Sequence, residues 1–230
     1  MKDTIHNLAV GNRISYLLIS IFLLNVAYPF SETGTIAALL FIGLYLALTG
    51  SAIYLVSNNR NLLIFAIALA VMIGIAGGIT VASNFTAPLW IQLIWNASLF
   101  AQVLLVIIIL VAFIIGSQIV TREVLSAAIV IYFLLASIFS LMYVVIETLT
   151  PGAFISSSGA EITWQRLTYF SLVTISTLGY GDIVPVAPAA QSLSAMEASI
   201  GTLYIAILIG RFVSLYRSEL PRNRRPDDSP

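Results

Sequence analysis

Long apolar runs, separated by isolated charged residues, dominate the pattern of hydrophobic and polar positions. A membrane-spanning helix needs about 20 mainly apolar residues, and six stretches between the charges meet that length. They lie near residues 14–30, 35–57, 62–82, 89–119, 124–148 and 191–216. A transmembrane β-barrel would instead show alternating segments of about 10 residues, whereas residues 103–115 are apolar at every position. The pattern therefore predicts an all-α membrane protein with six transmembrane helices.

A seventh apolar stretch is amphipathic and too short to cross a bilayer. It runs from Ile162 to Ser176, between the fifth and sixth predicted spans, and follows a loop rich in Pro, Gly and Ser. Apolar segments of this length beside a membrane are typical of re-entrant helices. Irregular backbone at membrane depth is tolerated only where it is buried in protein or lines water. We therefore expect a re-entrant helix and a loop that lines a pore or cavity.

Composition supports a membrane protein and excludes several functions. Hydrophobic residues make up 60% of the chain and charged residues 9%. The formal net charge is zero, so nothing indicates a nucleic-acid partner. The chain has no cysteine, no cluster of metal-ligating residues and no nucleophile that can be tied to a base. We expect neither an enzyme nor an organic cofactor.

The distribution of Lys and Arg predicts the orientation in the membrane. Six spans place both termini on one side, and Arg166 is the one basic residue on the other side. The nine that share the side of the termini are Lys2, Arg13, Arg60, Arg122, Arg211, Arg217, Arg222, Arg224 and Arg225. By the positive-inside rule, both termini are expected to be cytoplasmic in a multi-pass protein of the cell membrane.

The linker from Gly116 to Glu123 separates two halves of the chain. We expect a four-helix transmembrane domain over residues 1–122 and a helix, re-entrant loop, helix unit over residues 123–217. Residues 218–230 form a short polar cytoplasmic tail, whose arginines are suited to contact anionic membrane lipids.

The segment from Tyr169 to Pro185, YFSLVTISTLGYGDIVP, resembles the pore helix and selectivity filter of potassium channels. In that family a T-V-G-Y-G loop from each of four subunits lines the pore, and its backbone carbonyls replace the hydration shell of the ion. The resemblance covers roughly residues 124–217. It implies a homotetramer that conducts K⁺ passively, with K⁺ bound at Thr177, Leu178, Gly179 and Tyr180, and with Gly181 completing the filter.

The residue types of this filter fit the geometry that the resemblance implies. Consecutive carbonyls can point inward only if some residues adopt conformations that favour glycine, hence Gly179 and Gly181. Thr177 adds a hydroxyl oxygen. Leu178 departs from the valine that is usual in the family, and its side chain, like that of Tyr180, is expected to pack away from the pore axis.

Residues next to the filter are expected to support it. Thr174 and Ser176 end the pore helix, and Asp182 directly follows the filter. Some family members carry a glutamate that pairs with this aspartate. Because Val173 occupies that position here, we expect Asp182 to lack the partner.

The last span carries two notable residues. Glu197 is the one acid inside a predicted span away from its ends, where a carboxylate costs at least about 2.5 kcal/mol. We expect it behind the filter, hydrogen-bonded to Ser171 or Thr174, although an acid with no role is the alternative. Gly201 matches the glycine described as the inner-helix hinge in the family.

The front half lacks the charges of a voltage sensor. Steep voltage gating uses 3–4 charges in each of four subunits, and residues 89–119 contain no Lys or Arg. We therefore expect a potassium channel that is not conventionally voltage-gated. The alternatives are a cation transporter, for which no inverted repeat is evident, and a less selective cation channel. Either could be gated by lipid or a hydrophobic ligand bound to the front four helices.

Overall fold

The computed structural model describes residues 2–32, 35–83 and 87–219, and the chain there is mostly helical. Residues 220–230, most of the predicted cytoplasmic tail, lie outside the described residues. The long helices are α1 (Lys2–Ala27), α2 (Thr35–Val56), α3 (Arg60–Ala82), α4 (Leu89–Gly116), α5 (Arg122–Leu149) and α7 (Pro188–Glu219). The short elements are a 3₁₀ turn (Tyr28–Glu32), β1 (Phe154–Ser156), α6 (Trp164–Ile175) and β2 (Ile183–Pro185).

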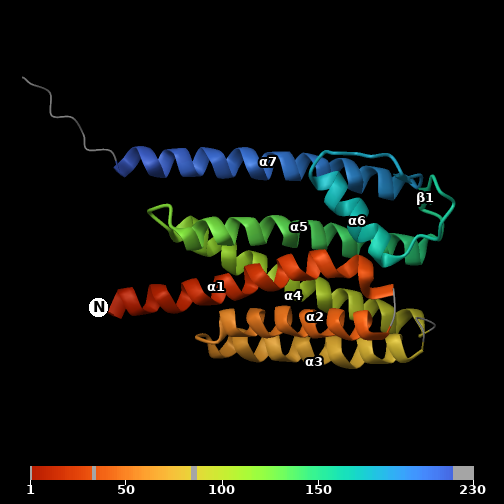
Figure 1. The fold of residues 1–230 in the computed structure, drawn as a ribbon, viewed down its shortest axis with the longest axis horizontal. Coiled ribbons are helices and arrows are strands. Elements are labelled where there is room, and N and C mark those ends of the chain that lie inside the picture. The colour runs from red at the N-terminus through yellow and green to blue at the C-terminus, as the bar shows by residue number, and fades with distance from the viewer. Residues whose placement is uncertain (1, 33–34, 84–86, 220–230) are drawn as a thin grey trace, which may run out of the picture.

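The long helices run side by side along the long axis of the molecule (Figure 1). The N-terminus and the end of α7 lie at one end of the bundle. The short helix α6 lies at the other end, near β1, with α5 below it and α7 above it. Helix α6 packs against both of these helices. The predicted re-entrant segment is therefore the short tilted helix, whereas the six long helices lie along the bundle.

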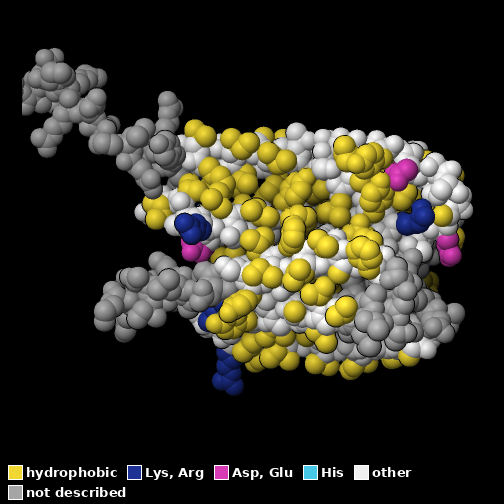
Figure 2. Space-filling view, viewed as in Figure 1, with side chains coloured by type: hydrophobic (Ala, Val, Ile, Leu, Met, Phe, Trp, Pro, Cys, Tyr) yellow, Lys and Arg dark blue, Asp and Glu magenta, His cyan; other side chains and the backbone are white. Residues whose placement is uncertain are grey.

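Among the residues that the structure describes, five helices are long and apolar enough to cross a membrane. Their apolar segments are Arg13–Phe30, Arg60–Thr80, Leu89–Gly116, Arg122–Leu149 and Pro188–Ser214. The described apolar segment of α2, Gly43–Val56, is shorter. Figure 2 shows hydrophobic side chains along the bundle and charged side chains gathered toward its two ends. The chain is thus a multi-pass helical membrane protein, while the sixth span remains a prediction.

The break between α4 and α5 falls at the predicted linker. Helix α4 ends at Gly116, and the extended backbone of Ser117, with φ −78° and ψ 132°, leaves the helix. Helix α5 begins after Thr121, whose hydroxyl accepts a hydrogen bond from the backbone N–H of Val124. Such an N-cap satisfies one of the four free N–H groups at a helix start. Local chemistry therefore sets this boundary.

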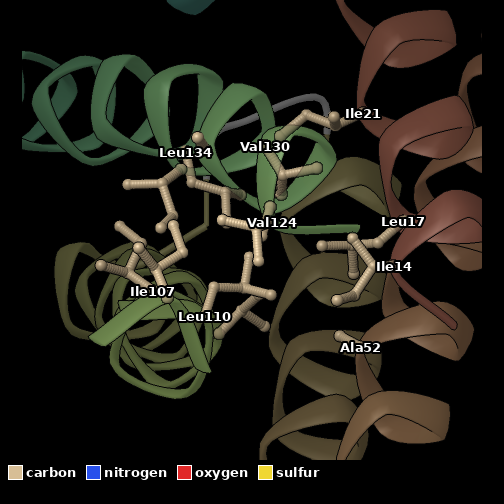
Figure 3. Close-up of a cluster of buried hydrophobic side chains, with 14 of the residues drawn as sticks. Ile14, Leu17, Ile21, Ala52, Ile107, Leu110, Val124, Val130 and Leu134 are labelled. Atoms are coloured by element: carbon tan, nitrogen blue, oxygen red, sulfur yellow. The ribbon is translucent and has the colours of Figure 1, made fainter. Parts of the chain in front are cut away.

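A buried apolar cluster joins the two halves (Figure 3). It brings α1, α2 and α4 together around α5, and its labelled members are Ile14, Leu17, Ile21, Ala52, Ile107, Leu110, Val124, Val130 and Leu134. Lipid tails are as apolar as leucine, so van der Waals packing rather than removal from water stabilises such contacts in a membrane. Helix α5 therefore connects the front helices to α6 and α7.

Candidate selectivity filter

An aromatic cluster holds α6 in place between α5 and α7. The rings of Tyr143 on α5, Phe154 on β1 and Phe170 on α6 contact one another edge to face, with centroids 5.2–5.3 Å apart. Such pairs contribute about 0.5–1.5 kcal/mol each beyond their buried area. At its start α6 is capped by Thr163, whose hydroxyl accepts from the N–H of Arg166. The helix that precedes the filter is therefore fixed at both its cap and its buried face.

The backbone N–H groups that follow α6 point back at that helix. The N–H of Thr177 donates to the carbonyl of Thr174 at 2.9 Å, and those of Leu178 and Gly179 donate to the carbonyl of Val173 at 3.0 and 3.4 Å. No peptide bond in the described chain is cis. In a planar trans peptide the carbonyl points opposite to the N–H. The carbonyls of Ser176, Thr177 and Leu178 therefore point away from α6.

The same segment alternates between two backbone conformations. Thr177, Gly179 and Gly181 have positive φ angles of 58°, 56° and 75°, while Leu178 and Tyr180 between them do not. Alternation of this kind turns successive carbonyls toward one side of the chain. The sequence predicted the two glycines. It did not predict the positive φ angle of Thr177. A strained conformation at a non-glycine residue costs about 1–3 kcal/mol and has no sequence signal.

Within a single chain the side chains of the filter are largely uncovered. Tyr180 is 65% exposed and stacks on Tyr169 of α6, with the ring planes 5° apart and the centroids 6.4 Å apart. Leu178 is 56% exposed. The packing that the sequence led us to expect around both side chains is thus incomplete. Apolar surface beside the filter is left free for a neighbouring chain to cover.

Asp182 has a side-chain partner on α6 at a position that the sequence did not indicate. The side chain of Val173 is apolar and buried, but the hydroxyl of Tyr169, one turn earlier on α6, donates to the carboxylate of Asp182. Burial and this hydrogen bond raise the pKa of Tyr169 to about 12, so its phenol remains a donor at neutral pH. The sequence indicated only that position 173 offers no acidic partner, and it did not point to Tyr169.

A two-stranded sheet fastens the segment after the filter, a feature that sequence reasoning did not find. Strands β1 and β2 pair antiparallel, with Phe154 opposite Pro185. The N–H of Ser157 donates to the carbonyl of Asp182, and that of Val186 to the carbonyl of Ala153, each at 2.8 Å. Three-residue strands give too short an alternation to be recognised. The filter is therefore held by α6 before it and by the sheet after it.

Comparison with known families agrees with this geometry. The sequence model of a family described as "Ion channel" matches residues 103–218, half of the chain. The chain belongs to this ion-channel family. The match begins within α4 and includes α5, α6, the filter and α7. Channels are not enzymes, which agrees with the expectation from the sequence.

Three similar proteins are potassium channels by name. Two pore potassium channel c of Oryza sativa subsp. japonica is 42% identical over 64 residues, which are 28% of this chain and 14% of the relative. Potassium voltage-gated channel protein shk-1 of Caenorhabditis elegans is 42% identical over 55 residues, 22% of this chain and 10% of the relative. Inward rectifier potassium channel Kirbac3.1 of Paramagnetospirillum magnetotacticum is 32% identical over 81 residues, which are 34% of this chain and 24% of the relative. The chain thus matches less than a third of each relative's length. No solved structure matches it.

Two of the expected filter-supporting residues of the channel act through the end of α6. The carbonyl of Thr174 accepts from Thr177, and the hydroxyl of Ser176 donates to the carbonyl of Leu172 at 2.8 Å. These bonds use backbone carbonyls at the end of α6, where a helix has free carbonyl groups. Both residues therefore stabilise the turn that follows α6, and their support of a filter remains a prediction.

Glu197 lies on the face of α7 that packs against α5 and α6; its place behind a selectivity filter remains a prediction. The side chain is fully buried. Its Oε2 accepts from the hydroxyl of Tyr143 at 2.5 Å, and its Oε1 contacts the hydroxyl of Ser171. Of the two predicted partners, the structure selects Ser171. Glu197 thus links the three helices α5, α6 and α7.

Gly201 lies one turn after Glu197, where α7 passes the end of α6. A Cβ atom at Gly201 would lie 2.2 Å from the carbonyl oxygen of Ile175, far inside contact distance. Helix α7 runs unbroken from Pro188 to Glu219. The close approach of the two helices requires glycine here, and the predicted hinge role of Gly201 remains a prediction.

Arg211 contacts the end of α4, a role that the sequence did not reveal. Its Nη2 donates to the carbonyls of Ile115 at 2.8 Å and Ser117 at 3.1 Å. A cation favours the carbonyl end of a helix because that end carries partial negative charge. The partners lie more than 90 positions apart, so no local pattern indicates the contact. Arg211 ties the inner helix of the channel to its front half.

Proposed function

We propose that the protein is one subunit of a tetrameric, potassium-selective channel that conducts K⁺ passively across the cell membrane. The observation that carries the proposal is the filter backbone. Three consecutive N–H groups bond to the end of α6, so the carbonyls opposite them face away from the protein scaffold. Backbone carbonyls arranged in this way can replace the hydration shell of K⁺.

The proposed ligands are the carbonyls of Thr177, Leu178, Gly179 and Tyr180, with the hydroxyl of Thr177 below them. One chain supplies one row of oxygens, whereas an ion needs oxygens on all sides. Cyclic symmetry of four chains supplies them. The exposed side chains of Leu178 and Tyr180 support this assembly, because a neighbouring subunit would cover them.

Helix α7 supports a pore-lining role. It buries one face, formed by Ala190, Leu193, Glu197 and Gly201, against α5 and α6. Its opposite face is exposed, and Ile207 is 70% exposed. In a fourfold assembly this face would meet the pore or a neighbouring subunit, and both chain termini would be cytoplasmic.

We propose further that the channel is not conventionally voltage-gated. Helix α4 contains no Lys or Arg, and one elementary charge supplies about 2.3 kcal/mol per 100 mV. The relatives are named as a two-pore, a voltage-gated and an inward rectifier channel, and all three names include potassium. Their similarity supports K⁺ as the permeant ion. The proposal on gating rests instead on the sequence of this chain.

A flux assay in liposomes tests the proposal. Vesicles that contain the purified protein and a K⁺ gradient should develop a K⁺ diffusion potential without an added ionophore, and vesicles with an equal Na⁺ gradient should not. Native mass spectrometry of the same preparation should show four chains. Equal responses to the two gradients would contradict selectivity, and a conducting monomer or dimer would contradict the proposed assembly.

A further inference from the structure

Around Glu197, three pairs of oxygen atoms lie within hydrogen-bond distance, but the two hydroxyl groups involved supply only two hydrogens. The hydroxyl of Ser171 contacts both Oε1 of Glu197 and the carbonyl of Ala136, the latter at 2.7 Å. The hydroxyl of Tyr143 contacts Oε2 of Glu197. Ser171 and Tyr143 each have one hydroxyl hydrogen, so two hydrogens serve three contacts. A third hydrogen is needed, and the carbonyl of Ala136 cannot carry it.

Only a proton on Glu197 completes the network. A protonated Oε1 donates to the oxygen of Ser171, Ser171 donates to the carbonyl of Ala136, and Tyr143 donates to Oε2. With an ionised carboxylate, one contact would bring two oxygen atoms together with no hydrogen between them. Such a contact is repulsive, and a buried group left without its hydrogen bond costs about 1–3 kcal/mol.

Within the part of the chain that the structure describes, the surroundings of Glu197 offer no positive charge to stabilise an ionised form. Its hydrogen-bonding partners within the described chain are the hydroxyls of Tyr143 and Ser171. On α6, Arg166 bonds to Ser156, and Tyr169 bonds to Asp182. On α7, Arg211 bonds to the end of α4. The remaining titratable or charged groups of α5 are Arg122, Glu123, Tyr132 and Glu147; of these, Glu147 accepts from backbone N–H groups of Gly152 and Phe154.

We propose that Glu197 is a neutral carboxylic acid in this conformation, and that release of its proton is coupled to separation of α7 from α6. When the O–H bond breaks, the proton passes to water, and the hydrogen of Ser171 turns from Ala136 to the carboxylate. The inner helix must then move to hydrate the charge. The inference rests on the proposed function, because the coupling acts on the pore of a channel.

The register of the two helices carries this movement to the filter. Glu197 contacts Ser171, and four residues later Gly201 contacts Ile175. Residues i and i+4 share one face of a helix, so both contacts lie along the same α6–α7 seam. Ile175 precedes Thr177 by two positions, and Thr177 bonds to the end of α6. A shift of α7 at Glu197 therefore disturbs the base of the filter directly.

Infrared difference spectroscopy tests the protonation state without relying on conduction. The spectrum of the wild type minus that of Glu197→Gln, in lipid at neutral pH, should contain the carbonyl band of a protonated carboxyl group. Glu147→Gln is the matched control, because Glu147 accepts two backbone N–H bonds and should give carboxylate bands. Carboxylate bands from Glu197 at neutral pH would overturn the proposal.

A second variant keeps the test valid if Glu197→Gln does not assemble. Tyr143→Phe removes the hydroxyl that donates to Oε2 and should move the protonated carbonyl band to higher frequency, because a hydrogen bond weakens the C=O bond. A band of unchanged frequency, or no protonated band, would contradict the proposed network.

The pH profile of open probability tests the coupling. In the wild type the ratio of open to closed channels should change by about tenfold per pH unit for each proton that opening releases, over the interval in which the protonated band disappears. The Glu197→Gln profile should be flat over that interval, because glutamine offers the same donor and acceptor without titrating. A profile shared by both proteins would overturn the coupling. Loss of K⁺ selectivity in both would contradict the proposed function instead.

Discussion

The front helices and the pore unit satisfy their polar groups in different ways. In the front half, polar side chains bond to their own helix: Thr80 to the carbonyl of Ala76, Asn96 to that of Gln92, and Ser98 to that of Ile94. In the pore unit, some polar side chains also bond to their own helix, such as Ser194 to the carbonyl of Ala190, but others bond between helices. Ser140 of α5 bonds to Thr168 of α6 at 2.8 Å, and Tyr204 of α7 donates to the carbonyl of Ala128 of α5 at 2.6 Å.

This difference separates two kinds of assembly. Helices held by apolar packing alone can slide or tilt with small changes in contact, whereas helices joined by directional hydrogen bonds have one register. The front half has an exception at its end, where Arg13 donates to Asn58 and lies over the ring of Tyr54. The structure therefore combines an adaptable front half with a pore unit of fixed register, joined through α5 and Arg211.

The largest effect is expected at the tightest contact of the pore unit. Gly201→Ala places a methyl group 2.2 Å from the carbonyl oxygen of Ile175. Overpacking against backbone costs about 1–3 kcal/mol or more per subunit, so tetramer assembly should be lost in size-exclusion chromatography. Gly74→Ala in α3 is the control, because no atom lies within 4 Å of its added Cβ. A stable Gly201→Ala tetramer would contradict the proposed fixed register of α7 against α6.

A second pair of substitutions compares the effect of backbone strain at a proposed filter glycine with its effect at a glycine outside the filter. Gly179→Ala should abolish K⁺ selectivity, because a positive φ costs an ordinary residue about 1–2 kcal/mol in each of four subunits. Gly159→Ala is the control outside the filter, with a φ of +71° and free space around the added Cβ. It should lower thermal stability slightly and leave the reversal potential unchanged. Equal behaviour of the two variants would contradict a filter at residues 177–181.

Substitution of one buried serine in each region compares the contribution of polar groups to stability in the pore unit and in the front half. Ser171→Ala removes a bond between helices and leaves Oε1 of Glu197 without its partner, so it should cost about 1–3 kcal/mol of stability. Ser98→Ala removes a hydroxyl that bonds to its own helix, and its cost should be within about 0.5 kcal/mol. Thermal denaturation of the purified protein in lipid measures both. A larger loss for Ser98→Ala would reverse the comparison.

The smallest effect is expected where the two regions meet. Arg211→Gln loses charge-assisted bonds to the end of α4, each of which contributes about 1.5–3 kcal/mol when buried and less when partly exposed. Since Arg211 is only half-buried, stability should fall by about 1 kcal/mol. Arg211→Lys keeps the charge and should retain part of that stability in the same thermal assay. Identical losses in both variants would show that the charge is irrelevant to this contact.

Much of the fold followed from the sequence because apolar length and charge position are sufficient to place helices. The predicted segment from Ile162 to Ser176 became α6, and the linker at Gly116 became the break between α4 and α5. The contact of Glu197 with Ser171 was also predicted, because a buried acid needs a hydroxyl or cationic partner nearby.

The remaining features depend on distances that no local pattern encodes. Tyr169 as the partner of Asp182, Arg211 at the end of α4 and the pairing of β1 with β2 each join segments far apart or in an unusual register. The hinge role of Gly201, which the resemblance to potassium channels implied, remains a prediction. The structure adds that Ile175 lies too close to Gly201 to leave room for a side chain there.

The most direct test of the central claim is the reversal potential of the purified protein in a planar bilayer with unequal K⁺ and Na⁺ on the two sides. We predict a reversal potential close to the K⁺ equilibrium potential, with a shallow voltage dependence of about one gating charge or fewer, because α4 has no Lys or Arg. A reversal potential near zero under these ion gradients would contradict a filter at residues 177–181.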